Sequence, residues 1–154
     1  MAGLTPTRTN NSNVRDHTWL ASREGLENAH SATLDAASLG AAGTHKLENW
    51  LRGGTPLGEI TATGAKKGQY GLYDPAATDG RQHHVGFLVD SIQLSDPVTG
   101  AANVPITGAI LRRGQVLVNR LPVTFVPSDT VTPGATEDDP DTVTATVSKH
   151  FIYR

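Results

Sequence analysis

The sequence predicts a mainly β domain, preceded by an extended N-terminal arm. Glycine and proline number 16 and 9 among 154 residues, as is typical of chains with many turns. Apolar residues alternate with other residues over 85–89 and 142–147, with the period of a half-buried strand. The 3.6-residue apolar period of a helical bundle is missing. We therefore expect an arm over residues 1–52 and a β-rich domain over residues 53–154.

The arm begins with a polar segment, residues 2–16, that is rich in threonine, asparagine and proline. Since this segment shows no apolar period, we expect it to be mobile in the isolated protein. A small apolar island that contains Trp19 and Leu20 follows. Trp19 either folds back on its own domain or anchors the arm on a partner, because aromatic side chains dominate interface energies. We expect Trp19 and Leu20 to contact a partner.

Two segments of the arm are candidates for helix. Residues 31–42 are rich in alanine, and their pattern does not decide between a short helix and an extended segment. Residues 44–52 favour a helix, because Leu47, Trp50 and Leu51 fall on one face. Thr44 would cap this helix and Gly53 would end it. At two turns it is marginal alone and needs tertiary packing.

The β-rich domain is predicted to consist of short strands separated by turns. Val85, Phe87 and Val89 share one face and are followed by apolar residues of the other parity, which predicts a bulge or bend near Asp90. The segment 112–114, Arg-Arg-Gly, is typical of a hairpin turn between two strands. A loop over residues 136–141 is acidic and contains proline. The expected strands are residues 57–63, 85–94, 106–111, 115–119, 123–125 and 143–153.

The composition excludes several classes of function. The net charge is −2 and both signs are mixed along the chain, so no basic stripe is present to bind nucleic acid. Cysteine is absent, which removes disulfides, zinc–thiolate sites and thiol catalysis. No apolar run approaches the roughly 20 residues of a membrane span. The polar start of the chain leads us to expect no signal peptide. We expect neither a nucleic-acid partner nor a membrane partner.

No motif predicts a catalytic, cofactor-binding or metal site. His83 and His84 are adjacent, so in a strand they point to opposite faces and do not readily bind one metal. We expect them to be a surface pair at the start of a strand. Residues 64–68 lack the pattern of a phosphate-binding loop, and their two lysines are expected to be solvated. The serine-hydrolase pattern Gly-x-Ser-x-Gly is also missing. We expect a protein that is not an enzyme and that carries no cofactor and no metal.

Residues 74–80, Asp-Pro-Ala-Ala-Thr-Asp-Gly, carry two carboxylates and a glycine. They lack the alternating ligands and the distal glutamate of a calcium-binding loop. Asp74 before Pro75 favours the start of a turn, and Asp79-Gly80 favours a tight turn with positive φ. We expect this segment to hold two strands in register.

A longer pattern surrounds this turn. Pro56-Leu57-Gly58 lies in the segment 54–63, residues 70–80 read Tyr-Gly-Leu-Tyr-Asp-Pro-Ala-Ala-Thr-Asp-Gly, and residues 85–88 read Val-Gly-Phe-Leu. The pattern resembles the head decoration proteins of tailed phages, the lambda-type capsid-stabilising proteins. Phe87 stands where that family usually has an aliphatic residue. The resemblance covers about a quarter of the chain.

The resemblance implies a mainly β domain with a small α/β part, the β-tulip, that forms homotrimers at three-fold positions on the outer surface of the virion capsid. It also implies an N-terminal arm that orders on binding and adds a strand to the major capsid protein. Trp19 and Leu20 are then the expected capsid contacts. The implied function is to stabilise the expanded head against the pressure of packaged DNA. The residues of the motif with an expected structural role are Pro56, Leu57, Gly58, Asp74, Pro75, Asp79 and Gly80.

Two other classes of function remain open. A carbohydrate-binding or adhesive β module displayed on a virion predicts exposed aromatic side chains on the β domain, for which Trp50, Tyr70 and Tyr73 are the candidates. An enzyme predicts a converging cluster of polar side chains, which the sequence does not display.

Overall fold

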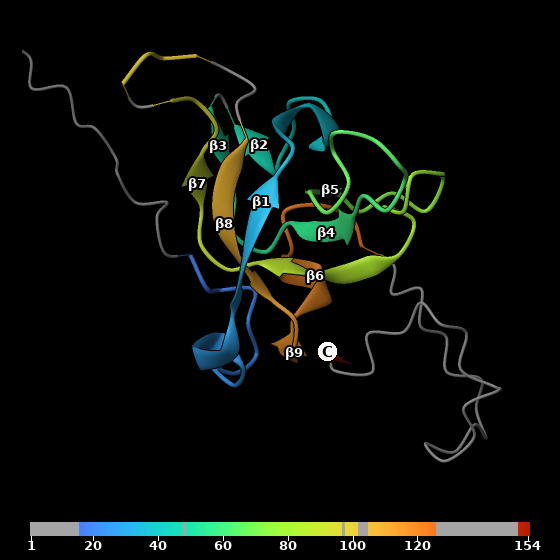
Figure 1. Cartoon of the computed structure of the whole chain (residues 1–154). Helices are drawn as coiled ribbons and strands as arrows, with labels where there is room; N and C mark the ends of the chain where they lie inside the picture. Colours follow the sequence, from blue (N-terminus) through green and yellow to red (C-terminus); the bar gives the residue numbers. More distant parts are fainter. Residues whose placement is uncertain (1–15, 48, 97, 102–104, 126–150) are drawn as a thin grey trace, which may run out of the picture.

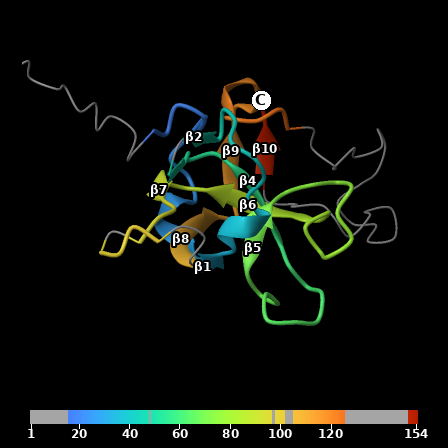
Figure 2. The ribbon, with the colours of Figure 1, turned by 90° about the horizontal axis from the view of Figure 1, so that it is seen from above.

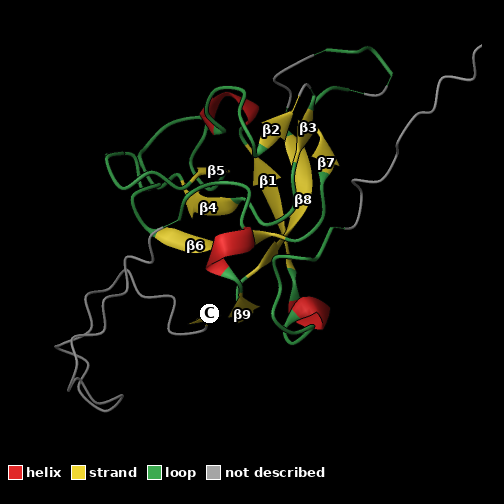
Figure 3. Cartoon of the chain, turned by 180° about the vertical axis from the view of Figure 1, so that it is seen from behind, coloured by secondary structure: helices red, strands yellow, loops and turns green. Residues whose placement is uncertain are grey.

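A closed five-stranded barrel with two smaller sheets beside it forms the fold in a computed structural model of the chain (Figure 1). The structure describes residues 16–47, 49–96, 98–101, 105–125 and 151–154. Of these residues, 34% are in strands and 8% are helical, which confirms the prediction of a mainly β fold. The helical residues of the described chain belong to three short 3-10 segments, drawn red in Figure 3. These segments are η1 (Leu26–Asn28), η2 (Ala36–Ser38) and η3 (Val118–Arg120).

Five strands close the barrel in the order β1-β5-β4-β6-β8, with β8 returning to pair with β1. The pair β1 and β5 is parallel, and the other four pairs are antiparallel. Along the chain these strands are β1 (His30–Leu34), β4 (Pro56–Glu59), β5 (Tyr70–Leu72), β6 (His84–Leu88) and β8 (Ile106–Leu111).

Two small sheets extend the barrel. The first is antiparallel and contains β2 (Lys46–Leu47), β3 (Trp50–Leu51) and β7 (Ile92–Gln93). The second is parallel and contains β9 (Gly114–Val116) and β10 (Phe151–Tyr153), which lie side by side in Figure 2. The last described strand of the chain is therefore tied to the strand that follows the barrel.

Strand β6 and the second half of β8 are buried on both faces. Side chains alternate along a strand, so neighbouring residues point to opposite faces. Leu88 and Ile110 belong to an inner cluster, whereas their neighbours Phe87 and Leu111 belong to an outer cluster. The inner cluster consists of Ala32, Leu34, Leu39, Leu51, Leu57, Tyr70, Leu88, Leu94 and Ile110. The outer cluster consists of Trp19, Phe87, Val89, Leu111, Val116, Phe125 and Phe151.

An irregularity in β6 moves His84 to the outer cluster. The register between β4 and β6 shifts by one residue, so Val85 is an extra residue of β6. Val85 packs against the inner cluster, whereas the His84 ring lies 4.6 Å from the Phe87 ring, centroid to centroid. The predicted bend near Asp90 is confirmed, because the chain bends at Asp90 between β6 and β7. The bulge at Val85 is a further irregularity that the sequence did not predict, and its one extra residue exchanges the faces of the residues before it.

The helix predicted over residues 44–52 is wrong. Lys46 pairs with Leu51 and Leu47 pairs with Trp50, as the two strands of an antiparallel pair. Leu51 is fully buried in the inner cluster, while Leu47 is 49% exposed. The pairing of β3 with β7 stabilises these residues as strands more than a helix would, since a two-turn helix is unstable without packing.

Several other expected elements differ from the structure. Residues 31–42, left undecided by their pattern, contain strand β1 and segment η2. The expected hairpin at residues 112–114 is wrong, because β8 pairs with β1 and β6 while β9 pairs with β10. No strand forms over residues 123–125, and the strand expected over 115–119 ends at Val116. The predicted C-terminal strand is confirmed over Phe151–Tyr153, and residues 143–147 and the acidic loop 136–141 lie outside the described residues.

Residues 16–52, expected to belong to the arm, are part of the fold. Strand β1 pairs with β8 along its length, and Leu34 pairs with Tyr70 of β5. The expected boundary at residue 52 therefore does not separate an arm from a domain in the described chain. The physical reason is that β1 closes the barrel, which would otherwise leave β8 and β5 with open edges. Residues 1–15 lie outside the described residues.

Trp19 is packed against its own domain. It is 1% exposed, its Nε1 donates to the carbonyl oxygen of Asp16 at 2.9 Å, and its ring lies 5.8 Å from that of Phe87. The backbone of Gly54, at φ +85°, approaches so closely that a Cβ there would lie 2.9 Å from Trp19 Cγ. The structure thus corrects the expected role of Trp19 as an anchor on a partner, because burial in the outer cluster leaves almost no surface to offer. Leu20 is half-buried and pairs with Val116 in an isolated bridge.

We expect Trp19→Ala to lower the free energy of unfolding by about 3–5 kcal/mol, as truncation of a large buried aromatic side chain does elsewhere. Chemical denaturation measures this change. Leu47→Ala is the control, since the side chain is 49% exposed and the change should stay within about 0.5 kcal/mol. Equal effects of the two substitutions would contradict the packing assigned to Trp19.

Candidate functional site

Two glycines of the motif region allow a turn to lie across strands β4 and β5. Gly58 and Gly71 face each other in the register of these strands. A Cβ on Gly58 would lie 2.6 Å from the carbonyl oxygen of Arg81, and a Cβ on Gly71 would lie 2.7 Å from Arg81 Cδ. Arg81 Nη1 continues past them and donates to the carbonyl oxygen of Ser38 at 3.2 Å. The Pro-Leu-Gly segment and the residue after the Asp-Gly turn are therefore in direct contact.

The turn over residues 74–81 is closed by its own hydrogen bonds. The Asp74 N–H donates to the carbonyl oxygen of Arg81 at 3.1 Å, and Asp74 Oδ1 accepts the N–H of Ala76 at 2.9 Å. Gly80 has φ +114°. The turn roles predicted for Asp74 and for Asp79-Gly80 are thus confirmed. The turn joins β5 to β6, the two neighbours of β4.

The side chain and the backbone of Asp79 hold this turn through two different partners. Its carboxylate pairs with the Arg81 guanidinium at 2.9 Å, and its carbonyl oxygen accepts the N–H groups of Thr61 and Ala62 at 2.8 and 3.0 Å. Burial works to raise the pKa of Asp79, but the hydrogen bonds from Arg81 outweigh it and hold the pKa below its usual value. The carboxylate is therefore ionised at neutral pH and stays paired.

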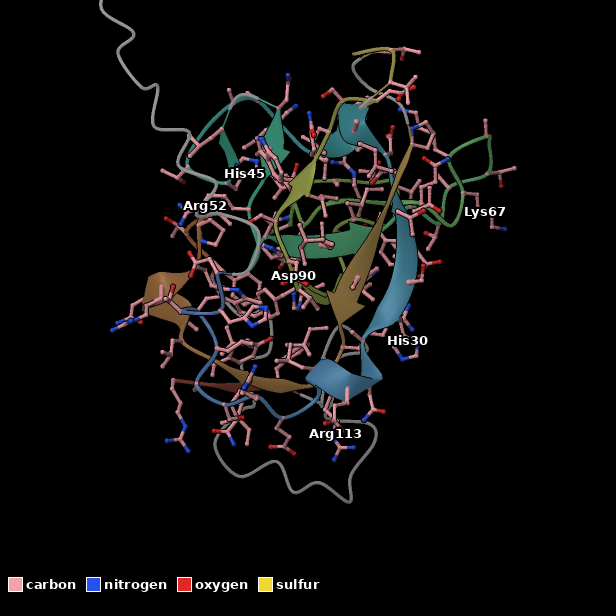
Figure 4. The ribbon with its side chains drawn as sticks, turned by 90° about the vertical axis from the view of Figure 1, so that its left-hand side faces the viewer. His30, His45, Arg52, Lys67, Asp90 and Arg113 are labelled. Atoms are coloured by element: carbon pink, nitrogen blue, oxygen red, sulfur yellow. The ribbon has the colours of Figure 1, made fainter. Side chains whose placement is uncertain are left out.

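The loop between β4 and β5 is tied to segment η2 by an ion pair. Lys66 Nζ lies 2.8 Å from Asp35 Oδ2, and the Ser38 hydroxyl also donates to that oxygen. Burial works to raise the pKa of Asp35, but hydrogen bonds from Lys66 and Ser38 lower it further than burial raises it. Lys67 is exposed and points away from the fold (Figure 4). Both lysines are exposed, as the sequence predicts, and the ion pair of Lys66 with Asp35 was not predicted.

The first described residues are held against one side of the barrel. His17 Nε2 lies 2.9 Å from Asp90 Oδ1, and Arg52 Nη2 lies 3.5 Å from Asp16 Oδ2. Figure 4 shows Arg52 and Asp90 on the same side of the molecule. Because these pairs are partly exposed, each contributes little free energy and acts mainly by orienting the chain. The buried ring of Trp19 supplies the strength of this attachment.

His84 lies in an aromatic cage that the sequence did not predict. It is 6% exposed, and its ring is 4.6 to 5.8 Å, centroid to centroid, from the rings of Phe87, Phe125, Tyr73 and Phe151. Its Nε2 is buried and has no hydrogen-bond partner among the described residues. Burial lowers its pKa from 6.5 to about 4, against a small opposing effect of a hydrogen bond to the Gly86 backbone. The expectation of a surface histidine pair is therefore wrong for His84, because Val85 bulges.

The three aromatic candidates for glycan binding lie in different surroundings. Tyr70 is 7% exposed, and its hydroxyl accepts a hydrogen bond from Arg112 at 2.7 Å. Tyr73 packs on Phe125 in the outer cluster. Trp50 is half-buried and lines an open groove of about 590 Å³.

Within the described ranges, no three histidine, cysteine or carboxylate side chains come close enough to hold a metal ion. The same part of the chain contains no helix that is both long and apolar enough to span a membrane. No protein-family model matches the chain, and no match was found among curated proteins or solved structures. The sequence motif and the geometry of the described residues are therefore the grounds for a functional assignment.

We expect Gly80→Ala to be much more destabilising than Gly68→Ala. Both glycines have positive φ, at +114° and +83°, so both substitutions carry backbone strain of about 1–2 kcal/mol. A Cβ on Gly80 would also lie 2.4 Å from Thr61 Oγ1 and 2.5 Å from the Glu59 carbonyl oxygen, whereas a Cβ on Gly68 meets nothing within 4 Å. Thermal and chemical denaturation compare the two. Similar losses would contradict the close packing of the turn.

We expect the free energy of unfolding to fall as the pH is lowered from 6.5 to 4. In this range the unfolded His84 is protonated and the folded one is neutral, so the unfolded state binds more protons and is favoured. The full loss is about 3 kcal/mol, the free energy that corresponds to the two pKa values. Urea unfolding at a series of pH values measures this slope.

Substitution of His84 separates its effect from those of the carboxylates. His84→Leu should flatten the slope between pH 6.5 and 4, whereas His30→Gln, at an exposed position, should keep it. The lowered pKa values of Asp35 and Asp79 act at lower pH, because their stabilisation is lost only as the pH falls below about 3.8. An unchanged slope in His84→Leu would rule out this assignment.

Proposed function

We propose that this chain is a capsid decoration protein that binds the expanded head of a tailed phage and stabilises it. In this proposal the barrel is the β-tulip domain of such proteins. Three copies sit as a homotrimer at a three-fold position on the outer surface, in contact with the major capsid protein. The activity is structural and needs neither a cofactor nor catalytic residues.

The observation that carries the proposal is the block of sequence from residue 54 to residue 88. Its parts are spread over 35 positions, yet in the structure they form one interlocked unit. Strand β4 carries Pro56-Leu57-Gly58 between β5 and β6, and the turn over residues 74–81 crosses it at Gly58. The spacing of the pattern therefore has a physical reason, which supports reading the resemblance as one of fold rather than of chance composition.

The attachment of the N-terminal segment supports an arm that is shorter than the sequence predicts. Since residues 16–52 are part of the fold, residues 1–15 remain as the candidate arm. These residues are polar and rich in threonine and asparagine, so they suit main-chain pairing with an exposed sheet edge of the capsid protein. Trp19 then anchors the base of the arm in its own domain, which transmits load from the capsid to the barrel.

Several weak arms are enough for tight binding. An arm that orders on docking loses conformational entropy, so each arm binds weakly by itself. Three arms on one trimer act together, and avidity raises the overall affinity roughly 10²–10⁴-fold. If the trimer binds the expanded shell but not its precursor, binding stabilises the expanded state by mass action. The net charge of −2 fits a protein that does this without touching DNA.

Co-sedimentation with expanded, undecorated heads of the cognate phage tests the proposal. We expect the full-length chain to bind at a stoichiometry of three copies per three-fold position. A chain without residues 2–15 should bind roughly 10²–10⁴-fold more weakly, because avidity of the arms is lost. A chain in which a Gly/Ser linker of equal length replaces residues 2–15 controls for size.

The outcomes separate the parts of the proposal. Equal binding of all three chains would mean that the barrel carries the affinity and that the arm does not. Failure of the full-length chain to bind the heads would overturn the decoration function itself. Chemical denaturation of the shortened chain checks that it still folds before its binding is compared, since it keeps Trp19 and the described residues.

A further inference from the structure

An open groove lies between the sheet β2-β3-β7 and the start of barrel strand β8. Its volume is about 590 Å³, and its lining comes from β3, β7, β8 and the residues that flank β7 and precede β8. The apolar part of this lining includes Trp50, Ile92 and Ile106, all half-buried. The polar part, here called the polar rim, includes Gln93, Thr107 and Asp96. An aromatic side chain beside a few polar groups is the composition of a specific small-ligand site.

We propose that this groove binds a neutral glycan, with a sugar ring stacked on Trp50 and its hydroxyl groups bonded to the polar rim. The proposal goes beyond the decoration function and does not depend on it.

Trp50 is suited to this role because its ring and its indole N–H are both available. In the described part of the chain its N–H donates to no group, and the side chain is only half-buried in the three-stranded sheet. A sugar presents one apolar face of C–H groups and a rim of hydroxyl groups. The indole matches it with an apolar body and one polar handle.

The polar rim is held in place before any ligand arrives. The Asp96 carboxylate accepts hydrogen bonds from the Val98 N–H and the Thr99 hydroxyl, both at 2.8 Å, and the first of these does most to lower the pKa of Asp96. Gln93 Nε2 donates to Ser95 Oγ at 3.0 Å. The Thr99 backbone N–H also donates to this carboxylate. An ionised carboxylate has about four acceptor sites, so Asp96 keeps about one for a ligand. The amide oxygen of Gln93 is also left to accept a sugar hydroxyl.

The charge of the groove argues against other small ligands. Among the described residues that line the groove, Asp96 is the one charged side chain, and no lysine, arginine or histidine joins it. An anionic ligand such as a phosphate would therefore be repelled. A single carboxylate is too few to hold a metal ion. A purely apolar ligand would leave the rim groups without hydrogen bonds, which costs free energy.

A peptide strand added to the edge of β7 is the main competing occupant. Strand β7 contains only Ile92 and Gln93, so it offers a short edge for main-chain pairing. Such an added strand would also leave the ring of Trp50 unused, since Trp50 belongs to the next strand, β3. These two features favour a glycan.

The full-length protein with maltohexaose, cellohexaose and chitohexaose as probes gives the test. The chain has two tryptophans, and Trp19 is 1% exposed, so Trp50 is the reporter. We expect at least one hexasaccharide, at millimolar concentration, to shift the indole N–H resonance of Trp50 and to protect its fluorescence from acrylamide quenching. The indole resonance of Trp19 should not move.

Three substitutions complete the test. Trp50→Ala should weaken binding at least about tenfold, and Gln93→Ala, at an exposed position, about two- to tenfold, as for the loss of one hydrogen bond. Ile152→Ala, at a 54% exposed residue of β10, is the matched control and should bind like the unaltered chain. If Trp50→Ala does not fold, Trp50→Phe, which keeps a ring, and Gln93→Ala carry the comparison.

Two results would overturn the proposal. One is that none of the three hexasaccharides perturbs Trp50. The other is that expanded phage heads protect Trp50 from quenching while the hexasaccharides do not, which would make the groove a capsid contact. Binding of a hexasaccharide by a chain that fails to bind heads would leave this proposal standing and remove only the decoration function.

Discussion

The burial of strand β6 and of the second half of β8 on both faces is the constraint on which the rest of the structure depends. One face of each strand fills the barrel, and the other needs a cover because Phe87 and Leu111 point outward. The cover comes from segments far apart in the sequence. Trp19 precedes β1, the first strand of the barrel, and Phe151 lies in β10, the last described strand. The outer cluster therefore packs both ends of the described chain against the barrel. Removing one of its aromatic rings would weaken the packing of both ends.

The pH dependence of stability arises from the same cluster. The extra residue Val85 places His84 in this cluster, among four aromatic rings, and its buried Nε2 has no hydrogen-bond partner in the described part of the chain. A neutral imidazole is tolerated there as an aromatic ring. A protonated one would need water or a counter-ion that the cage does not supply. The cost of that charge is the reason that burial lowers the pKa of His84.

The glycine pair Gly58 and Gly71, on strands β4 and β5, allows another close contact between segments far apart in the sequence. Without side chains at these positions, the turn that carries Arg81 lies flat on the two strands and reaches Ser38. Closely packed strands of this kind suit the mechanical role proposed above. The groove at Trp50 lies elsewhere in the fold, between the sheet β2-β3-β7 and the start of β8.

The sequence by itself determined the β class, strand β8 at its full length, the C-terminal strand over Phe151–Tyr153 and the turns at Asp74 and Asp79-Gly80. These features follow from local pattern and from the backbone preferences of aspartate, proline and glycine, which act over a few residues. Only the tertiary structure decided that residues 44–52 form strands, that Trp19 is buried and that His84 and Trp50 occupy a cage and a groove. Each of these depends on partners 30 or more positions away, such as β7 for Trp50 and Phe87 for Trp19. Pairing and burial at that distance outweigh local propensity, because apolar area removed from water contributes more free energy than a short helix does.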